Sequence, residues 1–199
     1  MPRAAASRAR RDQILRHARA LFARKGYHDT SIADIIEDAG IARGTFYLYF
    51  KGKREVFGAL LDILFHELDV RVKPVVLGPA EPSPLEQVKD NVRRVLELVV
   101  AEPEYLRIVL HHGTALDSQS VRALGRLYDG LLRMIEKSLQ LGKRMGIVRP
   151  CDTRVVSACI LGTVKEVVVR TATRGAAKID PAAIAEEIVE YGLRGIAAS

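Results

Sequence analysis

The stretch from Thr30 to Tyr49 constrains the fold more than any other part of the chain. Its first half places apolar residues at i, i+3, i+4 and i+7, the spacing that puts side chains on one face of a helix. These residues are Ile32, Ile35, Ile36 and Ala39. Gly40 follows where a helix ends, because glycine tolerates the positive φ of a C-terminal turn. A second short segment then runs to Tyr49, and two short helices across a tight glycine turn predict a helix-turn-helix.

Positive charge is concentrated around this motif. The chain has a net charge of +7, and residues 1–60 hold 12 Lys and Arg against 6 Asp and Glu, a net of +6. Residues 61–199 hold 19 against 18, a net of +1. This distribution is typical of a phosphate-binding head on a nearly neutral body. A solvated basic tail is the alternative, but the coincidence with the motif favours nucleic-acid binding.

Helical periodicity continues along the rest of the chain. A basic amphipathic helix is predicted over residues 9–25, after a mobile segment at residues 1–8. Further helices are predicted over residues 53–72, 85–101, 104–112, 118–145, 153–173 and 181–197. Four prolines between residues 74 and 84 break the pattern and predict a linker over residues 73–84. The predicted fold class is therefore all-α, with about nine helices.

Composition limits the cofactors and the cellular location. Cys151 and Cys159 are too few for a disulfide or zinc framework, so we expect two reduced thiols. The chain shows no signal-peptide pattern and no long apolar run, so we expect a cytoplasmic protein without a membrane partner. It also lacks a nucleophile elbow, a P-loop, an HExxH motif and an EF-hand, which argues against an enzyme. No cofactor and no metal ion are expected.

Residues 10–56 resemble the TetR family of bacterial transcriptional repressors. The resemblance rests on Gly26-Tyr27, Thr30-Ser31-Ile32, Ile35, Ala39-Gly40 and the run Gly44-Thr45-Phe46-Tyr47-Leu48-Tyr49-Phe50-Lys51-Gly52-Lys53. It implies a three-helix DNA-binding domain over residues 1–52 and an effector-binding and dimerisation domain over residues 53–199. It also implies a homodimer, in which the helices at 153–173 and 181–197 of both subunits form a four-helix bundle.

The sequence itself suits this dimer. Gly162, Gly192 and Gly195 permit a close approach of helices, and the 153–173 segment is apolar almost all round in its first half. The alternative is that the 153–173 segment is simply a central core helix.

Nine residues are predicted to contact a double-stranded DNA operator. They are Thr30, Ser31, Ala42, Arg43, Gly44, Thr45, Tyr47, Tyr49 and Lys53. Arg43 is the first choice for a base contact, because a guanidinium can pair bidentately with guanine; a phosphate contact is the alternative. Lys53 suits a phosphate by its charge and by its place at the start of a helix. Tyr49 either reaches a phosphate or packs inward with Phe46 and Phe50.

Five other residues of this set have the following predicted roles. Thr30 and Ser31 can cap the first helix of the motif, and their hydroxyls or backbone N–H groups can also reach a phosphate. Thr45 suits a thymine methyl group or a phosphate, and the Tyr47 hydroxyl suits a phosphate. Gly44 either lets the backbone approach DNA closely or is a plain turn glycine.

The resemblance further implies an effector pocket among the helices from 85 to 173. The candidate lining residues are Tyr105, His111, His112, Tyr128, Cys159 and Glu166. Each has a structural alternative; Glu166, for example, has Arg170 at i+4 as an ion-pair partner. His111 and His112 are adjacent and point roughly 100° apart on a helix, which argues against a shared metal ion. Abundant Val, Leu and Ile favour a small apolar effector.

These observations predict a ligand-responsive DNA-binding regulator. We expect a repressor that a small apolar effector releases from a palindromic operator. The alternative is a DNA-binding activator or architectural protein without a small-molecule switch.

Overall fold

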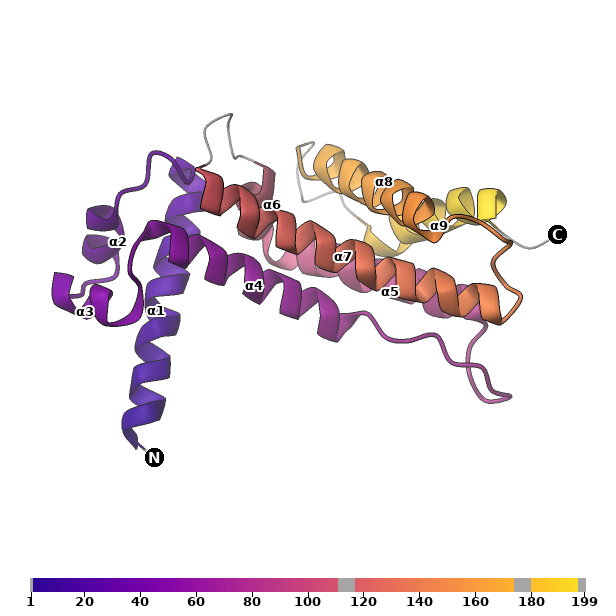
Figure 1. Cartoon of the computed structure of the whole chain (residues 1–199), viewed down its shortest axis with the longest axis horizontal. Coiled ribbons are helices and arrows are strands. Elements are labelled where there is room, and N and C mark those ends of the chain that lie inside the picture. Colours follow the sequence, from indigo (N-terminus) through magenta and orange to yellow (C-terminus); the bar gives the residue numbers. More distant parts are fainter. Residues whose placement is uncertain (1, 111–116, 174–179, 197–199) are drawn as a thin grey trace. The chain divides into compact units, whose positions relative to one another are not determined.

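The computed structural model describes residues 2–110, 117–173 and 180–196 (Figure 1). These ranges contain nine helices and no β-strand, which confirms the all-α prediction. The helices are α1 (Pro2–Lys25), α2 (Ile32–Asp38), α3 (Arg43–Tyr49), α4 (Lys53–Arg71), α5 (Pro84–Ala101), α6 (Pro103–Leu110), α7 (Ser118–Arg144), α8 (Thr153–Thr173) and α9 (Pro181–Ile196). No helix in the described part of the chain is both long and apolar enough to cross a membrane.

Local sequence signals explain several helix ends. Gly26, Gly40 and Gly146 follow α1, α2 and α7 with φ values of 86°, 60° and 72°, a backbone conformation that glycine adopts without steric cost. The start of α1 differs from the prediction, because this helix begins at Pro2 and not near residue 9. Proline suits the first position of a helix, and the alanines that follow it have the highest helix propensity.

The chain divides into two compact units. The first comprises Met1–Leu64 and Pro103–Leu127, and the second comprises Phe65–Glu102 and Tyr128–Ser199. Helices α4 and α7 therefore contribute residues to both units. The functional boundary between residues 52 and 53 stays a prediction, because compactness alone does not assign a function to either side.

The first unit has an aromatic and aliphatic core. Helix α1 packs against α2 and α6, and α2 packs against α3. The buried face of α1 consists of Ile14, Leu15, Ala18, Leu21 and Phe22. The Tyr27 ring lies 5.4 Å from that of Phe22 and 4.8 Å from that of Phe57, between ring centroids. Phe46 and Phe50 are fully buried, so α3 is held in one rotational orientation against this core.

The second unit is a helical assembly around α5. Helix α5 packs against α9 and α8, and α8 packs against α9. Its buried apolar side chains include Leu68, Leu96, Leu98, Leu139, Val168, Ala185 and Val189. The Lys89 ammonium joins α5 to α9, lying 3.0 Å from a carboxylate oxygen of Glu186 and 3.0 Å from one of Glu190.

Candidate nucleic-acid interface

Helix α2 begins in a complete capping box. The Asp34 N–H donates to Ser31 Oγ at 3.0 Å, and the Ser31 N–H donates to Asp34 Oδ2 at 2.7 Å. The Lys25 ammonium donates to Asp34 Oδ1 at 2.8 Å. The pKa of Asp34 is well below its usual value. The hydrogen bond from Lys25 is the largest cause, and the hydrogen bonds from Ser31 come next. The predicted cap at Ser31 is therefore confirmed.

Thr30 lies inside the first unit. It is 0% exposed, and its hydroxyl donates to the carbonyl oxygen of Gly26 at 2.7 Å. The N-cap of α2 is Ser31, so the predicted capping by Thr30 is wrong. The burial of the Thr30 hydroxyl argues against its predicted phosphate contact, which stays a prediction. The hydroxyl instead donates to a carbonyl oxygen just after the end of α1. The sequence alone indicates Thr30 only as part of the start of α2. A contact through the Thr30 backbone N–H stays a prediction.

Helix α3 has a buried inner face and an exposed outer face. Phe46 is fully buried, whereas Arg43 and Gly44 are exposed and Tyr47 retains 44% of its surface. The Arg43 guanidinium lies 5.9 Å from the centroid of the Tyr47 ring, so the cation and the phenol share the outer face. The Tyr47 ring packs edge-on against Phe46, with centroids 5.4 Å apart. Helix α3 thus offers a cation and a hydroxyl to a partner while remaining anchored.

The other predicted residues in and next to α3 differ in exposure. Ala42 is exposed and occupies the N-cap position without a side-chain hydrogen bond. Thr45 and Tyr49 are half-buried, so both interpretations of Tyr49 remain open. The prediction did not include Leu48, which is 81% exposed. A helical wheel of residues 43–49 would have found it, since it falls on the outer face with Gly44, four residues earlier.

Lys53 has a role within the first unit that the sequence did not reveal. Its ammonium donates to the carbonyl oxygens of Tyr27 at 2.7 Å and of His28 at 2.9 Å. It also lies 4.6 Å from the centroid of the Tyr27 ring. Partial burial lowers the pKa of Lys53. The ammonium therefore joins the start of α4 to the end of α1, and its predicted phosphate contact stays a prediction.

A buried polar cluster completes the first unit. The Tyr27 hydroxyl donates to Asp117 Oδ2 at 3.0 Å, and Ser120 Oγ donates to the Tyr27 hydroxyl at 3.0 Å. Arg54 Nε lies 3.2 Å from the same Asp117 oxygen. Burial is the main reason that the pKa of Tyr27 is raised. The cluster links the segment between α1 and α2 and the first turn of α4 to the start of α7; the Tyr27 and Asp117 side chains that it joins are 90 residues apart in the sequence.

The predicted effector residues that the structure describes are divided between the two units. Tyr105 is buried in the first unit, where the Arg19 guanidinium lies 4.9 Å from its ring centroid. Tyr128, Cys159 and Glu166 belong to the second unit, and the last two are exposed on α8. The alternative role of Glu166 is confirmed by its 2.6 Å contact with Arg170 Nε.

The remaining two predicted effector residues, His111 and His112, lie outside the described residues. Within the described residues, no group of three or more His, Cys, Asp or Glu side chains is arranged to hold a metal ion.

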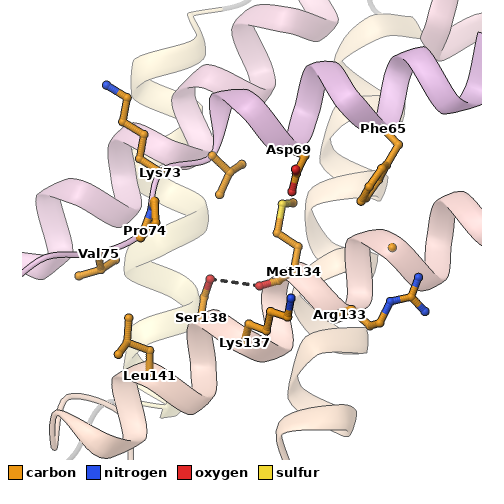
Figure 2. Close-up of a pocket in the computed structure, with 12 residues that line it drawn as sticks. Phe65, Asp69, Lys73, Pro74, Val75, Arg133, Met134, Lys137, Ser138 and Leu141 are labelled. Carbon is orange, nitrogen blue, oxygen red and sulfur yellow. Dashed lines mark hydrogen bonds between the residues drawn. The ribbon is translucent and has the colours of Figure 1, made fainter.

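The second unit contains a cleft that sequence reasoning missed. Its volume is about 300 Å³, and it lies between the last turns of α4, the segment that follows α4, and α7 (Figure 2). The lining residues are Phe65, Asp69, Val72, Lys73, Pro74, Val75, Gly130, Arg133, Met134, Lys137, Ser138 and Leu141. A Cβ at Gly130 would lie only 2.5 Å from the Phe65 ring, so this glycine sets how closely α7 approaches α4.

The walls of the cleft combine apolar and charged groups. Figure 2 shows Phe65 and Asp69 on one side, and Met134 and Ser138 opposite them. The Ser138 hydroxyl donates to the Met134 carbonyl at 3.2 Å, so it is satisfied within α7. Arg133 and Lys137 stand one turn apart on α7 and, with Lys73, outnumber the Asp69 carboxylate. The cleft therefore suits an apolar group that also carries negative charge.

Comparison with known proteins agrees with the motif and with the fold. The family model described as bacterial regulatory proteins of the tetR family matches residues 14–60. A second model, described as a tetracyclin repressor-like C-terminal domain, matches residues 81–196, which is more than half of the chain. The HTH-type transcriptional regulator YfiR of Bacillus subtilis is 29% identical over 147 residues, covering 71% of this chain and 69% of that protein.

Solved structures share the whole architecture. FadR from Bacillus subtilis, in complex with stearoyl-CoA, superimposes with a TM-score of 0.75 at 23% identity, covering 92% of this chain and 98% of that chain. A SmeT–triclosan complex superimposes with a TM-score of 0.78 at 18% identity, and the match covers 96% of this chain and 93% of that chain. At these identities the structures support the fold, and the two family models support the relationship. The chain belongs to the TetR family of bacterial regulatory proteins and is a DNA-binding transcriptional regulator.

Proposed function

We propose that this regulator is a cytoplasmic repressor that binds a palindromic operator as a homodimer and leaves it when an effector binds. The observation that carries the proposal is the outer face of α3. Its Arg43 cation and Tyr47 hydroxyl are exposed on a helix whose orientation Phe46 fixes from within. A rigid helix that presents such groups suits the major groove, where a guanidinium can pair with guanine.

Exposed apolar surface on the last two helices supports the homodimer. Helix α8 exposes Val155 at 59%, together with Ala158, Cys159 and Gly162. These positions follow i, i+3, i+4 and i+7, so they form one stripe along the helix. Tyr191 on α9 is 75% exposed. A second copy that covers this surface would remove it from water and would present two α3 helices to successive major grooves.

The cleft in the second unit supports the effector part of the proposal. We predicted a small apolar effector among the helices from 85 to 173, and the cleft adds residues 65–75 of α4 and its following segment to that region. The cations of Arg133 and Lys137 favour an apolar compound with an acidic group, such as a fatty acyl compound. The stearoyl-CoA bound by the FadR structure belongs to this class.

Helix α4 provides a physical route from effector to DNA. Asp69 and Phe65, in the later turns of α4, line the cleft, and Lys53 at its first residue is bonded to Tyr27 and His28. A ligand that binds better to one position of this helix shifts the population of dimers toward that position. If DNA favours the other position, the two ligands weaken each other's binding by the same factor.

The experiment measures release from DNA. Full-length protein selects a duplex from a random library, and fluorescence anisotropy follows its binding as stearoyl-CoA, palmitate or triclosan is added. We expect an acyl compound to release the wild type, and we expect Arg133→Ala combined with Lys137→Ala to need about tenfold more of it, because two charge contacts are lost.

A matched variant and a second measurement complete this test. Arg144→Ala removes an exposed cation from the same helix outside the cleft and should behave like the wild type. Static light scattering should report a dimer that Val155→Glu converts to monomer. Sequence-specific binding that none of these compounds changes would refute the proposed switch and favour a DNA binder without one.

A further inference from the structure

Leu48 combines a large apolar side chain with almost complete exposure. Its side chain is 81% exposed, more than any other large apolar side chain whose burial the structure describes. The exposure does not result from a loosely held helix, since Phe46 and Phe50 on either side of it are 0% and 1% exposed. Leu48 therefore points outward because α3 is anchored by its neighbours.

Leu48 shares the outer face of α3 with the groups that we propose contact DNA. At about 100° per residue, positions 43, 47, 44 and 48 fall in that order within an arc of about 140°. Arg43 and Tyr47 thus lie at one edge of this arc and Leu48 lies at the other. A duplex that meets the Arg43 and Tyr47 side chains in its major groove also meets Leu48.

Gly44 provides an independent sign of a close partner on this face. It lies within α3 without a positive φ, and a Cβ built on it would meet no atom within 4 Å. The fold of the protein alone therefore does not require glycine there, although glycine in a helix is less favourable than alanine by about 1 kcal/mol. Gly44 stands four residues before Leu48, so the outer face has an open notch beside its apolar side chain.

We propose that Leu48, beside the notch at Gly44, reads the 5-methyl group of a thymine in each operator half-site. Thymine is the base that presents a methyl group in the major groove, and an apolar side chain is the partner that recognises it. Contact with the methyl group would remove both apolar surfaces from water. This inference rests on the DNA-binding activity of the chain and not on the proposed effector switch.

The test removes the methyl group from DNA and the side chain from the protein. Each thymine of the selected duplex is replaced in turn by deoxyuridine, which lacks only the 5-methyl group, and full-length protein is titrated against each probe without effector. For the wild type we expect one position per half-site where the replacement weakens binding about fourfold, as for the loss of one buried methyl group. Leu48→Ala should lose this sensitivity, and Leu48→Met should keep most of it.

Two further variants separate DNA recognition from folding. Leu77→Ala removes a leucine that is 56% exposed in the segment between α4 and α5, and it should bind every probe like the wild type. Gly44→Ala should keep or raise the thermal stability, because alanine favours the helix, and yet weaken operator binding about tenfold by filling the notch.

Three results would overturn the proposal. The first is a Leu48→Ala variant that keeps the full sensitivity to deoxyuridine. The second is a wild type that no deoxyuridine replacement weakens, and the third is a Gly44→Ala variant that binds as tightly as the wild type. An equal loss of affinity in Leu48→Ala on all probes is one form of the first result, and it would assign the side chain to the sugar-phosphate backbone. Failure of the effector experiment leaves all of these measurements unaffected.

Discussion

The Lys53→Met variant tests whether this lysine serves the fold or the phosphate backbone. The substitution keeps most of the apolar stem and removes the ammonium, and with it the hydrogen bonds to the carbonyls of Tyr27 and His28 at 2.7 and 2.9 Å. Hydrogen bonds that involve a charged group contribute about 1.5–3 kcal/mol each, and a cation over an aromatic ring adds about 0.5–1 kcal/mol. Partial burial of the ammonium costs solvation energy, and the part of it that stays in contact with water weakens these interactions. Both effects reduce the summed contribution to stability. We expect a net loss of about 1–2 kcal/mol in the free energy of unfolding.

Two assays separate the alternatives. Urea unfolding gives the stability, and the dependence of operator affinity on salt concentration counts the phosphate charges that the protein neutralises. Because the Lys53 ammonium is bound inside the first unit, we expect the salt slope of Lys53→Met to change by much less than 1. Lys51→Met is the matched control: it removes the same charge from an exposed lysine two residues away, and its stability should stay within about 0.5 kcal/mol of the wild type.

The opposite pattern would refute this reasoning. If Lys53→Met unfolds at the wild-type urea concentration while its salt slope falls by about 1, the ammonium neutralises a phosphate and its contacts to the two carbonyls contribute nothing to stability. That result would confirm the phosphate contact that the sequence predicted.

Three other predictions concern the first unit. Arg43→Ala should weaken operator binding by about 1–3 kcal/mol and leave binding to random DNA nearly unchanged, whereas an equal loss on both would show a phosphate contact only. Because the pKa of Asp34 is lowered in the folded state, the stability that its carboxylate adds is present above about pH 4 and is lost as the pH falls below that value. The stability of Asp34→Asn should therefore depend less on pH than that of the wild type between about pH 4 and 2. An unchanged dependence would exclude Asp34 as its source. Tyr27→Phe removes a hydroxyl from the buried polar cluster and should lower the free energy of unfolding in urea by about 1–2 kcal/mol. Tyr47→Phe changes an exposed ring and should stay within about 0.5 kcal/mol of the wild type. Similar losses in both variants would contradict the role of the cluster.

The sequence predicted the features that depend on neighbours along the chain. Apolar spacing located the helices, the spacing of Ser31 and Asp34 predicted the cap of α2, and Gly40 marked the turn before α3. The run from Gly44 to Lys53 identified the family. All these signals act within one or two helical turns, where the chain geometry itself decides which groups can meet.

Only the tertiary structure decided where individual side chains are used. Lys53 suits a phosphate by its charge, but the fold also places its ammonium against the carbonyl oxygens of Tyr27 and His28, 26 and 25 residues earlier in the chain. The predicted effector residues were chosen by residue type, whereas the cleft joins residues 65–75 to residues 130–141, which are far apart in the sequence. Such contacts depend on how helices far apart in sequence pack, and no local spacing encodes that choice.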